Sequence, residues 1–550
     1  MSNRLLSILY LPFRLLIISV LSAFFLLRLS LQVITQRSSS VMISELIKRY
    51  FESLGGSFIK VGQTLAMRPD FFSIEFCETL SSLLDNVPPF RKTKGVKIIE
   101  RELRAPINTL FPTFDPTPVA AASFGQVYRG KDVEGNVVAI KVMRPGIEHV
   151  VFADIFFLRT LNFVFSLTGI GRRLGTDYLI EEIIDILKGE LDYRSEAQSI
   201  KISQINAENI PFLRVPRLYE QYSTRRVLCM EFLEGIWVKD VLSSLRKNGG
   251  QDLLGKDGKH IDTVALSNRM FTIGMRAVFE NNYFHADPHS GNILVMRDDE
   301  IGYIDYGIMG WTTSQFRKQQ IEYFKAIASG DVDSAVDAFT SFLVPQQGSD
   351  FKGFKRSVRI LLQLWMHSTD QPDAPMREKS TARLLLQSLH SARQFRFHLP
   401  MNVVRYFRSI LIVEGIILEL NPSFRMRVAL DTYFARLSML QIKNLMRFDK
   451  MFERGITSIK LLFSFPYILE SVSNNVRALE RASEVVQKDF NNFFRYASEV
   501  FYFLAFLFIL MRIFLRINNV APLIGLNYEI DYKFAVLVML YIAYRLDRIK

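Results

Sequence analysis

Cysteine is nearly absent from this chain, since only Cys77 and Cys229 occur among 550 residues. Two cysteines argue against a disulfide framework and against a cysteine-based zinc site. The scarcity of cysteine favours a body that faces a reducing compartment such as the cytosol. The chain is long enough to bury an ample core, and its length predicts two to four domains.

Blocks of basic residues are also missing. Lysine and arginine number 68 against 55 acidic residues, a net charge of +13, yet they are scattered along the chain. A nucleic-acid-binding tail would need a run of such residues, so we expect no nucleic acid partner. A membrane surface or a phosphorylated ligand explains the positive charge. Apolar residues make up 49% of the chain and 46 residues are Phe, which is rich for a purely soluble enzyme.

A long uninterrupted apolar run is lacking near the N-terminus. Leu15–Leu27 is apolar apart from Ser19 and Ser22, and Arg14 and Arg28 bracket it. Such a segment makes about 20 Å of helix, which is too short to cross a bilayer by itself. We predict an interfacial or core-docked helix, with a membrane span as the alternative. No small-residue cleavage site follows, which argues against a secretory signal.

Two apolar runs near the C-terminus, Val500–Leu515 and Phe534–Tyr544, predict a transmembrane helical pair. Arg512 interrupts the first run and must snorkel or face a partner. Basic residues at both outer ends suit a hairpin that enters and leaves the membrane on the cytoplasmic side. These outer residues are Arg495, Arg545, Arg548 and Lys550. The alternative is a buried helical pair inside a larger fold.

Between these ends, the pattern of apolar residues and turn signals predicts mixed helices and strands. The predicted elements are helices from Ser38 to about Asn86, strands over Ala120–Val142 with a hairpin turn at Glu134–Asn136, a helix over Asp177–Ile205, a strand over Arg226–Glu231, a helix over Thr263–Asn281, and mostly helix from Gly310 to about Phe490. No internal repeat is evident.

The most informative pattern lies at residues 284–307. Asp287 precedes Asn292 by five residues, an apolar strand and a polar turn follow, and a second apolar run ends at Asp305. This order is typical of the catalytic end of a protein-kinase-like fold. Because Mg²⁺ prefers hard oxygen ligands, we predict that Asn292 and Asp305 hold nucleotide-bound metal. Asp287 would face the reacting phosphate or the incoming hydroxyl.

Lys141 lies in the middle of an apolar strand, Val138–Val142. A buried ammonium needs a partner, and a kinase-like site supplies phosphate oxygens and a helix carboxylate. An edge-strand lysine facing solvent is the alternative.

Upstream, residues 120–128 occupy the place of a phosphate-covering loop but keep only Gly125 as a glycine, so the loop should be stiff. A small-residue turn packed under a helix is the other interpretation.

Three acids, Glu190, Asp192 and Glu196, lie within two predicted helical turns, with the last two on a shared face. One of them is expected to pair with Lys141, although clustered acids often form a solvated face.

Met230–Leu233 ends a predicted strand where the adenine-binding hinge would lie. By composition, Lys60–Gln63 is simply part of a helix with one polar turn.

Six motifs occur in a characteristic order: KVGQ at 60–63, AAASFGQV at 120–127, VAIKVMRPG at 138–146, ELDYRSEA at 190–197, HADPHSGN at 285–292 and IDYG at 304–307. As a set they resemble the UbiB (ADCK) family of atypical protein-kinase-like proteins, over roughly residues 40–310. The resemblance implies an α+β, bilobal kinase-like fold with added N-terminal helices, a helical C-terminal extension and a C-terminal transmembrane helical pair. The implied domains are an apolar segment (1–37), an extension with the KxGQ motif (38–118), an N-lobe (119–235), a C-lobe with its extension (236–490) and a membrane hairpin (491–550).

The resemblance also assigns roles to residues that match the family motifs. Asp287 is the catalytic aspartate, and Asn292 and Asp305 are the metal ligands. ATP contacts are assigned to Ala120, Ala121, Ala122, Ser123, Phe124, Gly125, Gln126, Val127, Lys141 and, as partner of that lysine, Glu196. The KxGQ residues Lys60, Gly62 and Gln63 lie across the protein-substrate site and meet the ExD residues Glu190 and Asp192. Ala286 replaces the arginine of His-Arg-Asp, and Tyr306 replaces the phenylalanine after the metal aspartate.

The implied activity is that of an ATPase using ATP and Mg²⁺ that supports ubiquinone (coenzyme Q) biosynthesis, as a regulator or by handling lipid intermediates. The implied location is the bacterial inner (cytoplasmic) membrane, with the kinase-like body facing the cytoplasm. Expected partners are membrane lipids, polyprenylated quinone precursors and ubiquinone-biosynthesis enzymes. The KxGQ segment would keep large substrates out, so protein phosphorylation in trans is disfavoured. A small-molecule or lipid kinase and a non-catalytic nucleotide-sensing scaffold are the alternatives.

Overall fold

The computed structural model describes residues 3–34, 40–66, 68, 71–83, 88–167, 176–210, 212–248, 253–255, 258, 260–371 and 380–445. Residues up to Arg436 form one compact unit, and Leu437 begins a second. The predicted transmembrane pair within 491–550 lies outside the described residues.

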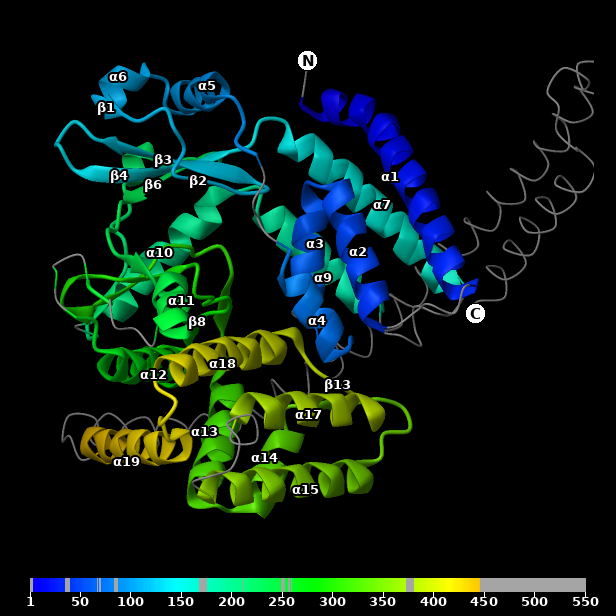
Figure 1. Ribbon diagram of the computed structural model, residues 1–550, viewed down its shortest axis with the longest axis vertical. Coiled ribbons are helices and arrows are strands. Elements are labelled where there is room, and N and C mark those ends of the chain that lie inside the picture. The colour runs from blue at the N-terminus through cyan, green and yellow to red at the C-terminus, as the bar shows by residue number, and fades with distance from the viewer. Residues whose placement is uncertain are drawn as a thin grey trace, which may run out of the picture. The chain divides into compact units, whose positions relative to one another are not determined.

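An antiparallel sheet of five strands occupies the first part of the kinase-like region (Figure 1). Its order is β1 (Thr113–Phe114), β3 (Gly125–Lys131), β4 (Val137–Met143) and β6 (Val227–Glu231), with β2 (Ala120–Ala121) paired to β3. The predicted hairpin turn is present, because Gly135 adopts a φ of +84° that favours glycine. The Asp132 carboxylate accepts the backbone N–H groups of Glu134 and Asn136 at 2.9 and 2.8 Å.

One face of this sheet is covered by α5 (Lys92–Leu103) and α6 (Ile107–Leu110) (Figure 1). The core between them contains Ile99, Phe111, Tyr128 and Ile140, all fully buried. Burial of such large apolar side chains is the main stabilising contribution here. The sheet therefore forms a rigid base for Lys141 in β4.

Four helices come before the sheet: α1 (Asn3–Ile34), α2 (Ser40–Leu54), α3 (Ser57–Ala66) and α4 (Ile74–Ser81). The predicted helical content of 38–86 is confirmed for the described residues. The predicted short apolar segment was wrong in length, because α1 continues through Arg14 and Arg28 for 32 residues. Arg14 pairs with Asp154 inside the protein, so it does not end the helix. One side of α1 packs on the protein, since Ile18 is fully buried. The choice between an interfacial helix and a membrane span stays a prediction.

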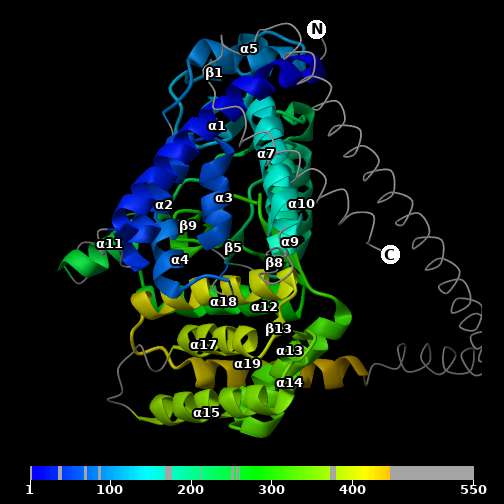
Figure 2. The ribbon, with the colours of Figure 1, turned by 90° about the vertical axis from the view of Figure 1, so that its right-hand side faces the viewer.

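A second apolar helix, α7 (Ile147–Leu167), lies alongside α1 (Figures 1 and 2). This helix was not predicted from the sequence. Two apolar stretches, Leu9–Gln32 and Ile147–Leu167, are long and apolar enough to cross a membrane by length and composition. In the described residues, only 11% and 22% of their respective apolar windows is buried inside the protein.

The helix predicted over Asp177–Ile205 is broken into α9 (Thr176–Gly189) and α10 (Tyr193–Ala207). Asp192 is the N-cap of α10, with its carboxylate accepting the Arg194 N–H at 3.1 Å. An aspartate competes well for this position because its side chain satisfies a free helix donor. The prediction that Asp192 and Glu196 share a helix face was therefore wrong.

Short sheets follow in the second part of the kinase-like region. One has the order β5 (Leu213–Arg214), β10 (Ile301–Tyr303), β9 (Ile293–Val295), β7 (Ile236–Trp237), and the other pairs β8 (Tyr283–His285) with β11 (Met309–Trp311). The predicted hairpin is present as β9 and β10, joined through η2 (Arg297–Asp299). Because β8 precedes this hairpin and β11 follows it, the pairing of these two strands brings the two catalytic motifs together.

Helices account for most of the remaining described chain, as predicted. They are α11 (Val238–Asn248), α12 (Thr263–Phe279), α13 (Ser314–Ser329), α14 (Val332–Thr340), α15 (Phe351–Asp370), α17 (Thr381–Gln394), α18 (Met401–Leu420) and α19 (Met426–Leu445); η1 (Glu220–Tyr222) and the pair β12 (Val344–Pro345) and β13 (Phe397–His398) complete the elements. α18 packs against α12 and also contacts α17 (Figure 2). This arrangement brings α18 next to the catalytic motifs.

Candidate nucleotide and metal site

Lys141 lies at the centre of β4 and forms a close pair with Glu196 from the first turn of α10. Its Nζ lies 2.9 and 2.7 Å from the two carboxylate oxygens of Glu196. A third group, Asp305, has an oxygen 3.9 Å from the same nitrogen. Burial opposes the charge, but Glu196 and Asp305 raise the pKa of Lys141 well above its usual value. The ammonium is therefore held charged and in place.

The two predicted metal ligands lie just outside the β9–β10 hairpin. Asn292 directly precedes β9, and Asp305 follows β10 by two residues. One Asp305 carboxylate oxygen accepts the backbone N–H of Gly307 at 2.9 Å. Burial opposes ionisation, yet Lys141 and Lys60 lower the pKa of Asp305 below its usual range. The structure thus presents an ionised carboxylate and a side-chain amide in one cavity.

This donor set fits Mg²⁺ in its nucleotide-bound form. Mg²⁺ commonly takes one or two carboxylates from the protein and completes its shell with phosphates and waters. Among the described residues, no cluster of three or more His, Cys, Asp or Glu side chains forms a metal cage. A site of one carboxylate and one amide oxygen therefore suits a metal that arrives with a phosphate ligand.

His285 joins the two catalytic motifs, a role the sequence patterns did not assign. Its Nδ1 accepts the backbone N–H of Asp287 at 3.1 Å, and its Nε2 lies 2.6 Å from the Asp305 carbonyl oxygen. Nδ1 is an acceptor here, so Nε2 carries the proton and donates. Burial lowers the pKa of His285, which favours this neutral form. The imidazole thereby sets the spacing between Asp287 and Asp305.

The KxGQ residues on α3 border the same site. Lys60 pairs with Glu190 at 2.6 Å, and Gln63 donates to the Leu83 carbonyl oxygen at 3.2 Å. A Cβ at Gly62 would lie 2.2 Å from a Leu83 methyl carbon, so only glycine fits there without movement. Among the ExD residues, Glu190 thus meets this segment, whereas Asp192 caps α10 and pairs with Arg194 at 2.6 Å.

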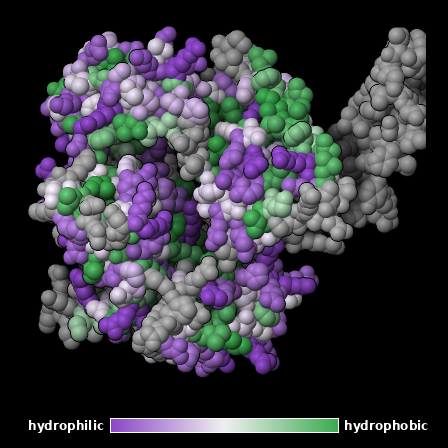
Figure 3. Space-filling model, viewed as in Figure 1, coloured by the Kyte–Doolittle hydropathy of each residue, from purple (hydrophilic) through white to green (hydrophobic). Residues whose placement is uncertain are grey.

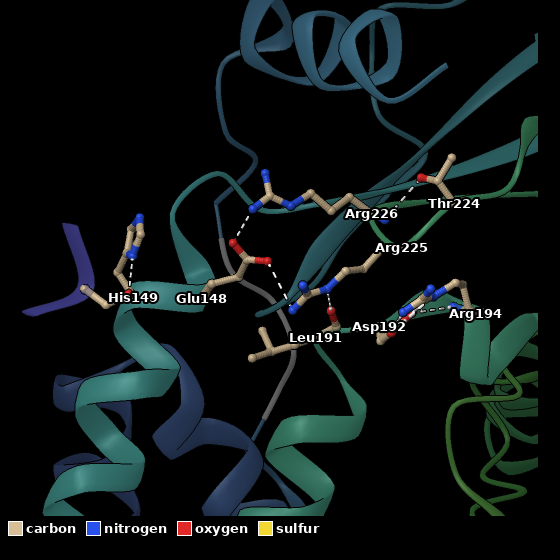
Figure 4. Close-up of polar contacts among 9 residues, drawn as sticks. Glu148, His149, Leu191, Asp192, Arg194, Thr224, Arg225 and Arg226 are labelled. Carbon is tan, nitrogen blue, oxygen red and sulfur yellow. Dashed lines mark hydrogen bonds and ion pairs between the residues drawn. The ribbon is translucent and has the colours of Figure 1, made fainter. Parts of the chain in front are cut away.

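A polar network holds the connection between α9 and α10 (Figure 4). Glu148, at the start of α7, pairs with both Arg225 and Arg226, which precede β6. Arg225 also donates from Nε to the Leu191 carbonyl oxygen at 3.3 Å. The network ties α7, β6 and the segment that carries Glu190 into one support.

The alanine-rich loop closes one side of the site. Ala120 and the stretch from Ala122 to Val127 line a cavity, whereas Ala121 does not. A Cβ at Gly125 would lie 2.4 Å from the Tyr193 hydroxyl oxygen, so the single remaining glycine permits close packing. Arg144 donates to the carbonyl oxygens of Ser123 and Ala122 at 3.2 and 3.1 Å, which stiffens the loop.

A single cavity of about 650 Å³ brings most of these groups together. The face seen in Figure 3 is hollowed beside α3. The predicted site residues that line the cavity are Lys60, Gln63, Ala120, Ala122, Ser123, Phe124, Gly125, Gln126, Val127, Lys141, Glu190, Asp287, Asn292 and Asp305. Gly62 and Glu196 do not line the cavity, but Glu196 contacts Lys141, which does. Arg408 of α18, which the sequence did not indicate, also lines the cavity and pairs with Asp287 at 2.8 Å.

Comparison with known proteins agrees with this geometry. Residues 82–339 match the ABC1 atypical kinase-like domain. The chain is 31% identical over 405 residues to "Probable protein kinase UbiB" of Shewanella piezotolerans, covering 72% of this chain and 70% of that protein. It is 32% identical over 388 residues to "Protein ACTIVITY OF BC1 COMPLEX KINASE 1, chloroplastic" of Arabidopsis thaliana, covering 70% of this chain and 54% of that protein.

Other similarities are broader. "Uncharacterized protein sll0005" of Synechocystis is 30% identical over 403 residues, which cover 73% of this chain and 56% of that protein. Against several of the curated relatives, the match spans between 51% and 66% of their own length. A solved structure, "The complex structure of Rv3197-erythromycin from Mycobacterium tuberculosis", aligns with a TM-score of 0.46 at 21% identity, over 67% of this chain and 89% of that one, a similarity too low to add to the assignment. The matched domain and the 31% identity over most of a UbiB protein show that this chain belongs to the UbiB-like family of ABC1 atypical kinase-like proteins.

Proposed function

We propose that this protein is a membrane-associated ATPase of kinase-like type that binds ATP with Mg²⁺ and supports ubiquinone biosynthesis. The observation that carries the proposal is the convergence of Lys141, Asp287, Asn292 and Asp305 on one cavity. A protein that only organised its partners would have no need for this complete constellation. Family membership adds independent support for a kinase-like activity.

Each residue has a distinct task in this mechanism. Lys141, held by Glu196, stabilises negative charge on the phosphates as the bond breaks. Asn292 and Asp305 would hold Mg²⁺, which when bound neutralises charge on the nucleotide. Asp287 orients the attacking water or hydroxyl through the carboxylate oxygen that Arg408 leaves available. The alanine loop, stiffened by Arg144, closes over the phosphates.

The surface of α1 and α7 supports the membrane part of the proposal. Large apolar side chains on both helices are exposed: Leu9, Phe13, Leu16, Val20, Phe24, Leu26, Leu27 and Leu31 of α1, and Phe152, Phe156, Phe163, Val164 and Leu167 of α7. We call this set the α1–α7 apolar face, and part of it is visible as the hydrophobic area at α1 in Figure 3. Its exposed charged neighbours, Arg28 and Arg159, are both cationic.

Such a face suits a helix pair that lies in the membrane interface. Exposed apolar areas of this kind mark membrane or protein contacts. The other side of α1 is tied to the body through the Arg14–Asp154 pair, which favours α1 lying along the membrane over α1 crossing it alone. Together with the predicted C-terminal hairpin, it supports our proposal that the kinase-like body faces the cytoplasm at a bacterial inner membrane.

Hydrolysis of ATP by the full-length protein tests the enzymatic part. We expect Mg²⁺-dependent release of phosphate, stimulated by liposomes and abolished in Asp287→Asn. Hydrolysis unchanged in that variant would favour the scaffold alternative. Labelled ATP with membrane extract separates the kinase alternative, because a labelled lipid product would indicate phosphoryl transfer to a lipid.

Lipid-quinone profiling of a deletion strain tests the biological role. We expect ubiquinone to fall in the deletion strain and to be restored by the wild-type chain. Asp305→Ala should fail to restore it at equal protein levels. Equal rescue by both would contradict a catalytic role, and an unchanged quinone profile would contradict the pathway.

A further inference from the structure

The cavity has a second part, lined by residues that the proposed nucleotide site does not include. This part of the wall is apolar and comes from α17, α18 and the segment after α4. The lining side chains there include Leu83, Leu386, Leu389, Val404, Phe407 and Leu411. Several belong to the buried core, so this wall is pre-formed. Ligand pockets combine such an apolar lining with a few placed polar groups.

The lining residues indicate where this apolar part lies relative to the proposed nucleotide site. Among the described lining residues, none belongs to the predicted adenine hinge at 230–233. The cavity instead extends from Lys141 and Asp305 past Asp287 to α18. In a kinase-like site, this direction leads from the phosphates toward the acceptor. The apolar half therefore lies beyond the phosphate end of the nucleotide.

Arg408 stands at the boundary between the polar and apolar halves. It donates from Nη2 to a carboxylate oxygen of Asp287 at 2.8 Å. Its other terminal nitrogen, Nη1, is buried and has no hydrogen-bond partner among the described residues. Leaving a charged donor unsatisfied costs about 1–3 kcal/mol or more, so a site for an anionic partner explains it. Apolar neighbours on the same helix, Val404, Phe407 and Leu411, cannot supply that partner.

We propose that this half of the cavity binds an amphipathic small molecule, with its anionic head group on Arg408 and its apolar body against α17 and α18. Arginine suits carboxylate and phosphate groups because its planar guanidinium presents several donors. A ligand held there lies beside Asp287, so it is placed to act as an acceptor or to control nucleotide turnover. This inference rests on the proposed nucleotide site, since it assigns the neighbouring half of the same cavity.

The two cysteines provide a local readout for the test. Cys77 lines the cavity, whereas Cys229 is fully buried in the five-stranded sheet. A ligand in the apolar half should slow alkylation of Cys77 by N-ethylmaleimide and leave Cys229 unchanged. Binding of an amphiphile elsewhere on the protein, including the α1–α7 apolar face, would not produce this pattern.

The probes are decyl phosphate, decanoate, uncharged decanol and inorganic phosphate, each added to the full-length protein. We expect decyl phosphate or decanoate to protect Cys77 at concentrations at least about tenfold lower than decanol, because a charged hydrogen bond is lost in decanol. Inorganic phosphate should also bind at least about tenfold more weakly than decyl phosphate, since it lacks the apolar body. The stronger of the two anionic amphiphiles identifies the preferred head group. Equal protection by decanol would overturn the proposal.

Variants assign the effect to Arg408. Arg408→Gln should weaken protection by decyl phosphate about 10-fold to 100-fold, whereas Arg405→Gln on the same helix should leave it unchanged. Leu386→Trp, at a partly exposed position of the apolar half, should abolish protection while the protein keeps its melting temperature. Unchanged protection in both Arg408→Gln and Leu386→Trp would refute the site.

Binding of a fluorescent ATP analogue with Mg²⁺ is measured in parallel. We expect wild type, Arg408→Gln and Leu386→Trp to retain it. If nucleotide binds and the amphiphile does not, this inference fails alone. If wild type binds no nucleotide, the proposed function fails, and the protection of Cys77 then reports the amphiphile site by itself.

Discussion

Two buried pairs of a cation and a carboxylate have similar geometry and opposite surroundings. Lys141 and Glu196 approach to 2.7 Å in the cavity, and Arg14 and Asp154 approach to 2.8 Å beneath α1. The first pair faces open space and a further carboxylate, Asp305. The second is closed, because Ser57 donates to Asp154 at 2.6 Å and the Asp154 side chain is 0% exposed.

This difference in surroundings distinguishes an ion pair that takes part in catalysis from one that only fixes the packing of two helices. A buried charge that is fully paired fixes the position of two elements, here α1 and α7, and leaves nothing for a ligand. A buried cation that faces a cavity and a spare carboxylate keeps charges available for phosphate and metal. The surroundings of the pair therefore indicate its role better than its distance does.

The largest expected effect on stability comes from breaking the fully enclosed pair, Arg14 and Asp154. Asp154→Ala leaves Arg14 buried without its carboxylate, and we expect the free energy of unfolding to fall by about 3–5 kcal/mol. Chemical denaturation measures the loss, and limited proteolysis should show α1 released first. Asp185→Ala is the control, because its pair with Lys188 is exposed and should contribute about 0–1 kcal/mol. Equal effects of the two substitutions would show that the buried Arg14–Asp154 pair does not fix α1 to α7.

The pair that faces the cavity, Lys141 and Glu196, should behave in the opposite way. A substitution beside it should reduce turnover strongly and stability only slightly. Asp305→Asn removes a metal ligand, and we expect Mg²⁺-dependent ATP hydrolysis to fall by about 100-fold or more. Lys141 keeps Glu196 as its partner, so the melting temperature should change little. Asp299→Asn in the same hairpin is the matched control for the assay. A large loss of stability in Asp305→Asn would mean that the cavity side is structural too.

An intermediate effect is expected from the support shown in Figure 4. Glu148→Gln weakens two ion pairs, with Arg225 and Arg226, and we expect about 1–2 kcal/mol of lost stability, since the carboxylate is only partly buried. Because the network positions the segment that carries Glu190, nucleotide turnover should fall modestly. A stability loss as large as that of Asp154→Ala would mean that this network is as important for folding as the Arg14–Asp154 pair.

The smallest effect on stability should come from the outer surface of α1. Leu16 and Phe24 are 62% and 65% exposed, so Leu16→Gln with Phe24→Gln should change the free energy of unfolding by less than about 1 kcal/mol. Sedimentation with anionic vesicles should nevertheless weaken at least about tenfold, because two apolar contacts with lipid are lost. Ile205→Gln on α10, 65% exposed and outside the face, is the control. Unchanged vesicle binding would argue against the α1–α7 apolar face as the membrane contact.

Much of the candidate site could be predicted because its motifs are local. Asn292 and Asp305 flank one hairpin, and a short hairpin between two apolar strands brings its ends together. Lys141 stood out because a charge in the middle of an apolar strand needs a partner. The break between α9 and α10 was missed, although Asp192 has the side chain of a typical N-cap, because apolar periodicity continues across it.

The sequence by itself determined the kinase-like motifs, their order and the catalytic hairpin, since these depend on spacing over a few residues. Only the tertiary structure decided that Arg408 meets Asp287, 121 residues away, and that Arg14 meets Asp154, 140 residues away. Neither arginine has a local pattern that distinguishes it from other arginines on helices. Such pairs form because long-range packing removes both groups from water together, and a burial that depends on distant segments leaves no periodic trace in the sequence.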